Sequence, residues 1–208
     1  IVRSKVIECL KNGQEVGLVT DRGTPLISDP GNVIVDESIK ENITVIALPG
    51  PNALLPALNM SGLSNERFLF YGFLNSKPSL AKKELIDLKD IKQTIIFYES
   101  PHRITATLSQ ILEVFGNRNI ALVREISKLH EEVIRDNIEN ILKISDTFKG
   151  ELVIIVEGNT QEETLEINYT EEINKLLTQG YSKRDAIREI ADKYNISKNK
   201  LYNEFKEN

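Results

Sequence analysis

The sequence predicts an α/β fold, because short apolar runs rich in β-branched residues alternate along it with stretches of helical periodicity. Runs with the character of buried strands lie at 16–20, 43–48, 94–98, 120–124 and 151–156. Between them, apolar residues recur at helical spacing over 1–12, 32–41, 52–60, 79–88, 102–115 and 131–145. Strands that alternate with helices indicate a parallel or mixed sheet covered by helices.

Changes in composition divide the chain into three parts, 1–74, 75–160 and 161–208. Glycine, proline and small polar residues cluster around the first boundary, and a polar, acidic stretch follows Gly158 at the second. The first part holds only two strand-like runs, too few for a sheet of its own. Since the chain also opens at Ile1 rather than at methionine, we expect a truncated first lobe that has lost its N-terminal strands.

The third part is predicted to be helical, with helices over 171–177 and 183–194 and another from 200 onward. The order of helix, short turn and helix is that of a helix-turn-helix. Residues 181–208 include seven basic and five acidic residues, so this segment carries +2 and the remainder −7 of the overall −5. This basic excess is compatible with contact to RNA or DNA. It is equally compatible with a solvent-exposed helix face, or with helices that pack on a sheet or form a dimer.

Composition excludes several classes of protein. With 40% hydrophobic and 27% charged residues in 208, the chain is typical of globular proteins. Its single cysteine, Cys9, cannot form an internal disulfide and indicates a reducing compartment, the cytoplasm. No apolar run reaches the roughly 18 residues that a membrane span needs, so no membrane partner is expected. His102 and His130 lack a metal-binding spacing, so we expect no metal.

Loops with residues suited to ligand binding follow the strand-like runs, at the position where open α/β sheets bind ligands. The loop 21–31 contains two glycines and two prolines, which make it rigid and let its backbone approach a ligand closely. The loop 49–53 opens a helix that Asn52 can cap. Neither G-x-x-x-x-G-K nor G-x-G-x-x-G occurs, so these loops favour a nucleoside over a pyrophosphate.

Charged residues follow the next two runs. Glu99 can act as a base or bind a ribose hydroxyl, and Arg103 can hold a phosphate, although a helix start with an internal Glu99–Arg103 pair is the simpler alternative. Arg124, Glu125 and Lys128 form a second charged group after the fourth run. Both groups are expected at the edge of the sheet where the loops lie.

Six segments of the chain form a specific set, in the order DRGTPLISDPG, LPGPNAL, FLFYGFL, TIIFYESPHR, LVREISKLHEE and GELVIIVEG. Over essentially all of 1–208, this set resembles the tetrapyrrole methylase superfamily, and within it the branch that methylates 16S ribosomal RNA. The resemblance implies two α/β lobes with S-adenosylmethionine bound in the cleft between them, and a homodimer. It also implies methyl transfer to the 2′-hydroxyl of a cytidine in small-subunit ribosomal RNA.

The resemblance implies where the cofactor is held. The first cofactor loop falls on Arg22, Gly23 and Thr24, with Ile27 beside the methionine part of the cofactor. Position 22 is commonly small in the family, and here its guanidinium would meet the cofactor or project to solvent. Further cofactor positions fall on Asn52, Ala53, Glu99 and Ile126, with Glu151 and Leu152 as additional candidates near the adenine. Family members usually begin with a Pro-x-Gly-Asn loop and a later Glu-Asp-Thr-Arg segment, and the absence of both agrees with a truncated first lobe.

On the substrate side, the same resemblance places Arg103 and Arg124 in the cleft. Methyl transfer from a sulfonium mainly requires alignment of the reactants. A base, or a cation near the developing alkoxide, assists attack by a 2′-hydroxyl. We therefore expect Glu99 or Glu125 as the base, and Lys128 or Arg124 as the group that stabilises negative charge.

Two other functions stay open at this point. A precorrin-type C-methyltransferase would share the fold, but its polyanionic substrate has no use for a basic tail. A non-enzymatic nucleic-acid-binding module would use the α/β part only as a scaffold for a dimer.

Overall fold

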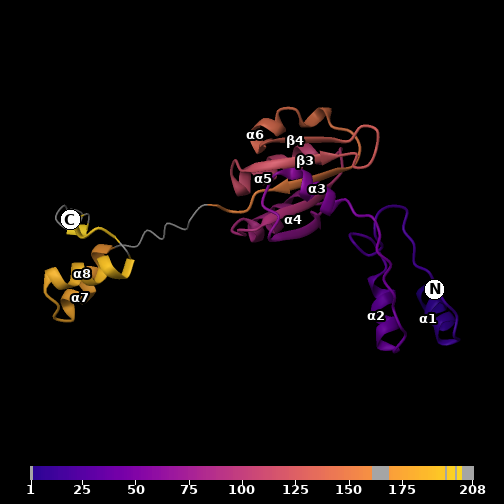
Figure 1. The fold of residues 1–208 in the computed structure, drawn as a ribbon, viewed down its shortest axis with the longest axis horizontal. Coiled ribbons are helices and arrows are strands. Elements are labelled where there is room, and N and C mark those ends of the chain that lie inside the picture. The colour runs from indigo at the N-terminus through magenta and orange to yellow at the C-terminus, as the bar shows by residue number, and fades with distance from the viewer. Residues whose placement is uncertain (1, 161–168, 195, 200, 203–208) are drawn as a thin grey trace. The chain divides into compact units, whose positions relative to one another are not determined.

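The computed structural model describes the chain except for residues 1, 161–168, 195, 200 and 203–208. It divides into two compact units, one over 1–160 and one over 161–208 (Figure 1). Each unit has its own apolar core. The first unit contains a sheet with helices, and the described part of the second is helical. The predicted fold class, mixed α/β with a helical C-terminal part, is confirmed.

Five strands among the described residues form one mixed sheet. They span Phe68–Phe73 (β1), Thr94–Glu99 (β2), Asn119–Arg124 (β3), Glu132–Asn137 (β4) and Leu152–Val156 (β5). Their order in the sheet is β1-β2-β5-β3-β4. β1 is parallel to β2, whereas β5 is antiparallel to both β2 and β3, and β4 is antiparallel to β3. β2 and β3 therefore run in the same direction and end at the same edge.

Helices cover both faces of this sheet. They span Leu54–Ser61 (α3), Pro78–Leu88 (α4), Ile104–Phe115 (α5) and Ile138–Leu142 (α6). On one face, Phe97 and Leu122 pack against α4, α5 and α6. On the other face, Ile96 and Val123 pack against α3. Because successive side chains of a strand point to opposite faces and both faces are covered, the inner positions of the central strands, 95–97, 120–123 and 152–156, are apolar and read as continuous runs.

Helices α1 (Val2–Lys11) and α2 (Asn32–Lys40) precede the sheet and contact each other. An ion pair of 2.6 Å joins Arg3 Nε to Glu37 Oε2, and another of 2.8 Å joins Lys11 Nζ to Glu41 Oε1. Pairs as exposed as these contribute little to stability.

The strands expected at 16–20 and 43–48 are not formed, which corrects the sequence prediction. Both segments are irregular, and among the described residues no strand pairs with either. Their apolar side chains lie largely in solvent; Val19 is 90% exposed and Leu48 is 81% exposed. An apolar, β-branched run becomes a strand only when a neighbouring strand pairs with its backbone groups.

Two strands of the sheet were not predicted. β1 is rich in aromatic residues and was singled out only as a motif, although it pairs with β2 along its length. The helix expected at 131–145 is wrong in its first half, which forms β4, and α6 follows directly. β4 lies at the sheet edge with exposed polar side chains, so its apolar periodicity is weak.

The second unit contains α7 (Tyr169–Thr178) and α8 (Lys183–Tyr194), followed by helical residues at 198–199 and 201–202. Ile173, Ile187 and Leu201 meet in its core. The Ser182 hydroxyl oxygen accepts a 3.2 Å hydrogen bond from the N–H of Asp185 and so caps α8. The succession of two helices, a turn and further helical residues agrees with the predicted arrangement. The third helix was expected to start at residue 200, and that residue and 203–208 lie outside the described part.

Candidate active site

Strand register brings the ends of four strands to one edge of the sheet. Glu99 is the last residue of β2 and lies opposite Leu152, the first residue of β5. Leu152 also lies opposite Arg124, the last residue of β3. Arg124 in turn faces Glu132 of β4, with 2.5 Å between Nε and Oε2. The sequence-predicted Glu99 and Arg124 therefore share the edge at which β2 and β3 end.

The first predicted cofactor loop is folded against the second. The Thr24 hydroxyl donates a 2.8 Å hydrogen bond to the carbonyl of Pro51. A β-carbon at Gly50 would lie 3.3 Å from that hydroxyl oxygen, so glycine allows the close approach. Leu26 and Ser28 adopt φ values of 73° and 59°, a conformation uncommon outside glycine and often found at functional sites.

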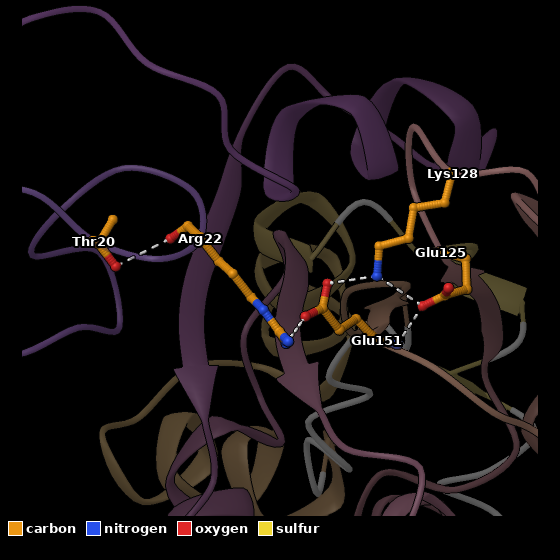
Figure 2. Close-up of polar contacts among 5 residues, drawn as sticks. All are labelled: Thr20, Arg22, Glu125, Lys128 and Glu151. Carbon is orange, nitrogen blue, oxygen red and sulfur yellow. Dashed lines mark hydrogen bonds and ion pairs between the residues drawn. The ribbon is translucent and has the colours of Figure 1, made fainter.

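A row of charged side chains links the first loop to the sheet edge (Figure 2). A guanidinium nitrogen of Arg22 contacts Oε1 of Glu151. Lys128 Nζ lies 3.3 Å from Glu151 Oε2 and 3.1 Å from Glu125 Oε1. The N–H of Glu151 donates to the same Glu125 oxygen over 2.9 Å. Cations and anions alternate along this row, which we call the Arg22–Glu125 network.

The network changes the ionisation of its inner members. A hydrogen bond from the N–H of Glu151, and then the ammonium of Lys128, hold the pKa of Glu125 below its ordinary value. Hydrogen bonds to Glu125 and then to Glu151 raise the pKa of Lys128. Both side chains are therefore charged at neutral pH. Water screens their attraction because the row lies at the surface.

The backbone around Glu125 is held in an uncommon conformation. Glu125 and Ser127 have φ values of 51° and 64°, which cost roughly 1–3 kcal/mol each in non-glycine residues. Gly150 faces this turn with φ 83°, and a β-carbon there would lie 2.2 Å from Glu125 Oε1. Glycine at position 150 therefore leaves the space that the Glu125 carboxylate fills.

Glu99 is held by a separate set of contacts. Its side chain is 1% exposed. The N–H of Ser100 donates to Oε1 over 2.7 Å, and the Thr107 hydroxyl donates to Oε2 over 2.6 Å. Arg103 Nε lies 3.7 Å from Oε1. The carboxylate thus joins the end of β2 to the first turn of α5.

Arg103 also contacts the segment that leads from β1 to α4. Its Nη2 donates to the carbonyls of Leu74 and Asn75 over 3.1 and 2.9 Å. In this arrangement the guanidinium holds main-chain carbonyls and the buried Glu99. Its role toward substrate stays a prediction.

Helix α3 begins beside the same sheet edge. Asn52 Oδ1 accepts a 3.0 Å hydrogen bond from the N–H of Leu55, as a capping residue does. Ala53 and Ile126, both predicted to contact the cofactor, pack against the core beneath α3. The structure therefore places these two residues, from the second and fourth loops, around one core.

Tyr98 belongs to this region and was not singled out from the sequence. Its ring packs edge-on against Phe70 and Phe73, with ring centroids 4.9 and 5.7 Å apart. Burial raises the pKa of Tyr98, while hydrogen bonds from the backbone of Leu54 and Ala53 act in the opposite direction. Its position one residue before Glu99, at the end of a buried strand, was the signal that could have found it.

A hollow of about 250 Å³ lies within the first loop region. The Thr20 hydroxyl bonds to a carboxylate oxygen of Asp29 beside it. Its lining combines apolar side chains with two carboxylates and comprises Leu18, Val19, Thr20, Asp21, Pro25, Asp29 and Pro30. Ile27, predicted to flank the cofactor, is 44% exposed. Apolar walls with acidic groups suit a ligand that has hydroxyl or cationic groups.

The described residues contain no group of three or more His, Cys, Asp or Glu side chains that could hold a metal ion. They also contain no helix long and apolar enough to cross a membrane. The predicted roles of individual residues in cofactor binding and catalysis stay predictions.

The fold and the loops at its sheet edge define a class of methyltransferase. The chain belongs to the tetrapyrrole methylase family, whose model, described as Tetrapyrrole (Corrin/Porphyrin) Methylases, matches residues 2–142. Two solved structures share the fold. The methyltransferase CobJ matches 78% of this chain and 72% of its own, with a TM-score of 0.59 at 16% identity. The cobalt precorrin-4 methyltransferase CbiF matches 75% of this chain and 69% of its own, with a TM-score of 0.53 at 13% identity.

Sequence relatives are more specific. The ribosomal RNA small subunit methyltransferase I of Bacillus subtilis is 40% identical over 97% of this chain and 72% of its own length. The protein of the same name from Pasteurella multocida is 38% identical over 95% of this chain and 72% of its own. The protein of that name from Synechocystis is 37% identical over 93% of this chain and 71% of its own length.

Proposed function

We propose that this protein transfers a methyl group from S-adenosylmethionine to the 2′-hydroxyl of a cytidine in 16S ribosomal RNA. One observation carries the proposal: over 97% of its length the chain is 40% identical to a ribosomal RNA small subunit methyltransferase I. The similarity to the methyltransferases CobJ and CbiF lies below 20% identity and concerns the fold.

The residues present fit such a cofactor. Rigid loops carrying Thr24 and Pro51 meet, and small residues there let the backbone approach a flat ring. Asp21 and Asp29 line a neighbouring hollow and can accept hydrogen bonds from ribose hydroxyl or ammonium groups. Arg22, Gly23, Thr24 and Ile27 are the proposed contacts from the first loop. Asn52, Ala53 and Ile126 are the proposed contacts from the remaining loops, and the buried Glu99 is proposed to support the cofactor site through Ser100 and Thr107.

When bound, the sulfonium supplies an activated methyl group, so the protein's main task is to align the attacking hydroxyl. Lys128 is the proposed cation beside the developing alkoxide, because Glu125 and Glu151 fix its ammonium group at the surface. Glu125 is the accessible carboxylate; its lowered pKa makes it a weak base and a good anchor for Lys128. The Glu99 carboxylate is buried, and we propose that it positions the residues after β2 through its contacts with Ser100, Arg103 and Thr107.

RNA is proposed to enter from the side of the charged edge. Arg124 and Arg103 are the proposed substrate contacts, although both also hold carboxylates within the protein. Residues 181–208 are proposed to add phosphate attraction, since this segment carries +2. Binding that depends on phosphate contacts should weaken as salt rises.

Assembly and location belong to the same proposal. We propose a homodimer in the cytoplasm, where ribosomal RNA is found. Exposed apolar side chains such as Val19, Ile46 and Leu48 support association, because a second copy would remove them from water. Light scattering of the purified protein tests the dimer, and a monomer at micromolar concentration would contradict it.

The experiment is methyl transfer with labelled S-adenosylmethionine to small ribosomal subunits that lack the modification. Nuclease digestion and mass spectrometry should then identify 2′-O-methylcytidine. Lys128→Ala should lower kcat by about tenfold or more, because the alkoxide loses its cation. Glu99→Gln should also lower the rate. Lys82→Ala removes a comparable surface cation, paired with Glu113 on α4 and α5, and should leave the rate unchanged.

Transfer to an anionic porphyrin and not to RNA would replace the proposal with the corrin-type reaction. Wild-type rates in both Lys128→Ala and Glu99→Gln would remove the proposed roles of these residues while keeping the activity.

A further inference from the structure

The turn between β3 and β4 is tightly held although it lies at the surface. Lys128 N–H donates to the carbonyl of Glu125 over 2.9 Å, and Glu131 N–H donates to that of Lys128 over 3.1 Å. The N–H of Ser127 donates to a side-chain oxygen of Glu131 over 2.6 Å. With two residues fixed at positive φ, the turn is braced by its own hydrogen bonds.

The tip of this turn presents an apolar side chain to solvent. Leu129 is 92% exposed, the largest value among the large apolar side chains of the described residues. His130, the next residue, is also exposed. The carboxylates on either side are engaged: Glu125 with Lys128, Glu131 with the N–H of Ser127. Glu125 is paired with a cation, whereas Glu131 keeps its negative charge because a neutral N–H donates to it. Leu129 therefore offers an apolar contact to a base rather than to a phosphate.

We propose that Leu129 is an RNA-contacting residue that inserts against an unstacked base next to the methylated nucleotide. This inference rests on the proposed function and extends it to the substrate side. Apolar side chains on rigid elements act as wedges between bases, because unstacked bases bury their faces against them. Its neighbour Lys128 belongs to the Arg22–Glu125 network, so a base held at Leu129 lies one residue from the proposed cation.

RNA is a better occupant than a second copy of the chain. A stable protein interface buries about 800 Å² on each partner, whereas this tip offers one leucine between polar residues. Bracing also fits a wedge, because a rigid turn loses little conformational entropy when it binds.

The test compares Leu129→Ala with Leu80→Ala, a leucine 43% exposed on α4. Methyl transfer to small ribosomal subunits is measured for both variants and wild type. Leu129→Ala should raise KM for the subunits about tenfold, as expected when a buried leucine contact is lost, with little change in kcat. Leu80→Ala should match wild type, and Leu129→Met should recover most of the affinity.

Calorimetry with S-adenosylhomocysteine and light scattering accompany the kinetics. Cofactor affinity and oligomeric state should be the same for Leu129→Ala and wild type. An unchanged KM with an active wild type overturns the inference alone. A change in oligomeric state overturns it as well, because Leu129 then lies in a protein interface. A wild type that methylates no RNA overturns the proposed function and the inference together.

Discussion

Replacing Thr107 by valine tests whether Glu99 anchors the edge of the sheet. Both residues are 4% exposed, and 2.6 Å separates the Thr107 hydroxyl from Glu99 Oε2. Valine keeps the shape of threonine and lacks the hydroxyl, so this carboxylate oxygen loses its donor inside the protein. The remaining contacts of Glu99, from Ser100 and Arg103, are to the other oxygen and cannot replace it.

The size of the effect follows from the charge of the acceptor. A hydrogen bond to a charged group contributes about 1.5–3 kcal/mol to stability. Leaving a buried acceptor without a donor costs a similar free energy. We expect Thr107→Val to lower the free energy of unfolding of the first unit by about 2 kcal/mol. For a unit of this size, that corresponds to a melting temperature lower by about 4–8 °C.

Urea unfolding at neutral pH, followed by far-ultraviolet circular dichroism, measures this difference. Ser109→Ala is the matched control, because Ser109 also lies on α5 but donates to the Thr105 carbonyl at an exposed position. The control should change stability by less than about 0.5 kcal/mol. If the two variants unfold at the same urea concentration, Thr107 does not hold Glu99 and the anchoring argument is wrong.

Three further predictions concern the network and the second unit. Gly150→Ala should destabilise the first unit by about 1–2 kcal/mol from its positive φ alone, and should lower methyl transfer because the new methyl group displaces Glu125. Gly116→Ala also places a β-carbon at positive φ, but in open space, so it should lower stability without the contact to Glu125 and should keep the activity. The pKa of Glu125 is lowered on folding, so its stabilising effect is present above the ordinary value and is lost as pH falls through the lowered one. The stability difference between wild type and Glu125→Gln should therefore shrink in acid, and a constant difference from pH 7 to pH 3 would contradict the pairing with Lys128. Ser182→Ala should lower the stability of the second unit by about 1 kcal/mol through loss of the α8 cap, measured by its thermal unfolding; an unchanged melting curve would refute this.

The central strands and most helices were predictable because their signals are local. The β-branched runs at 94–98, 120–124 and 151–156 correspond to β2, β3 and β5, and each is buried on both faces. The runs at 16–20 and 43–48 carry the same signal but remain irregular, because pairing depends on a neighbour that the pattern does not specify. β4 shows the converse, since pairing with β3 overrides a helical pattern.

The sequence alone determined the family, the α/β class and the loops in which polar residues gather, since each is written in short motifs. Only the tertiary structure decided how those loops meet. Thr24 reaches Pro51, Arg22 reaches Glu151, and Glu125 fills the space beside Gly150. The members of each pair lie at least 25 residues apart in the chain. Glu125 meets Gly150 because β3 and β5 pair in register, whereas the contacts of Thr24 and Arg22 join a loop outside the sheet to distant residues. Neither kind of contact is specified by a local pattern, because both require distant segments to pack together.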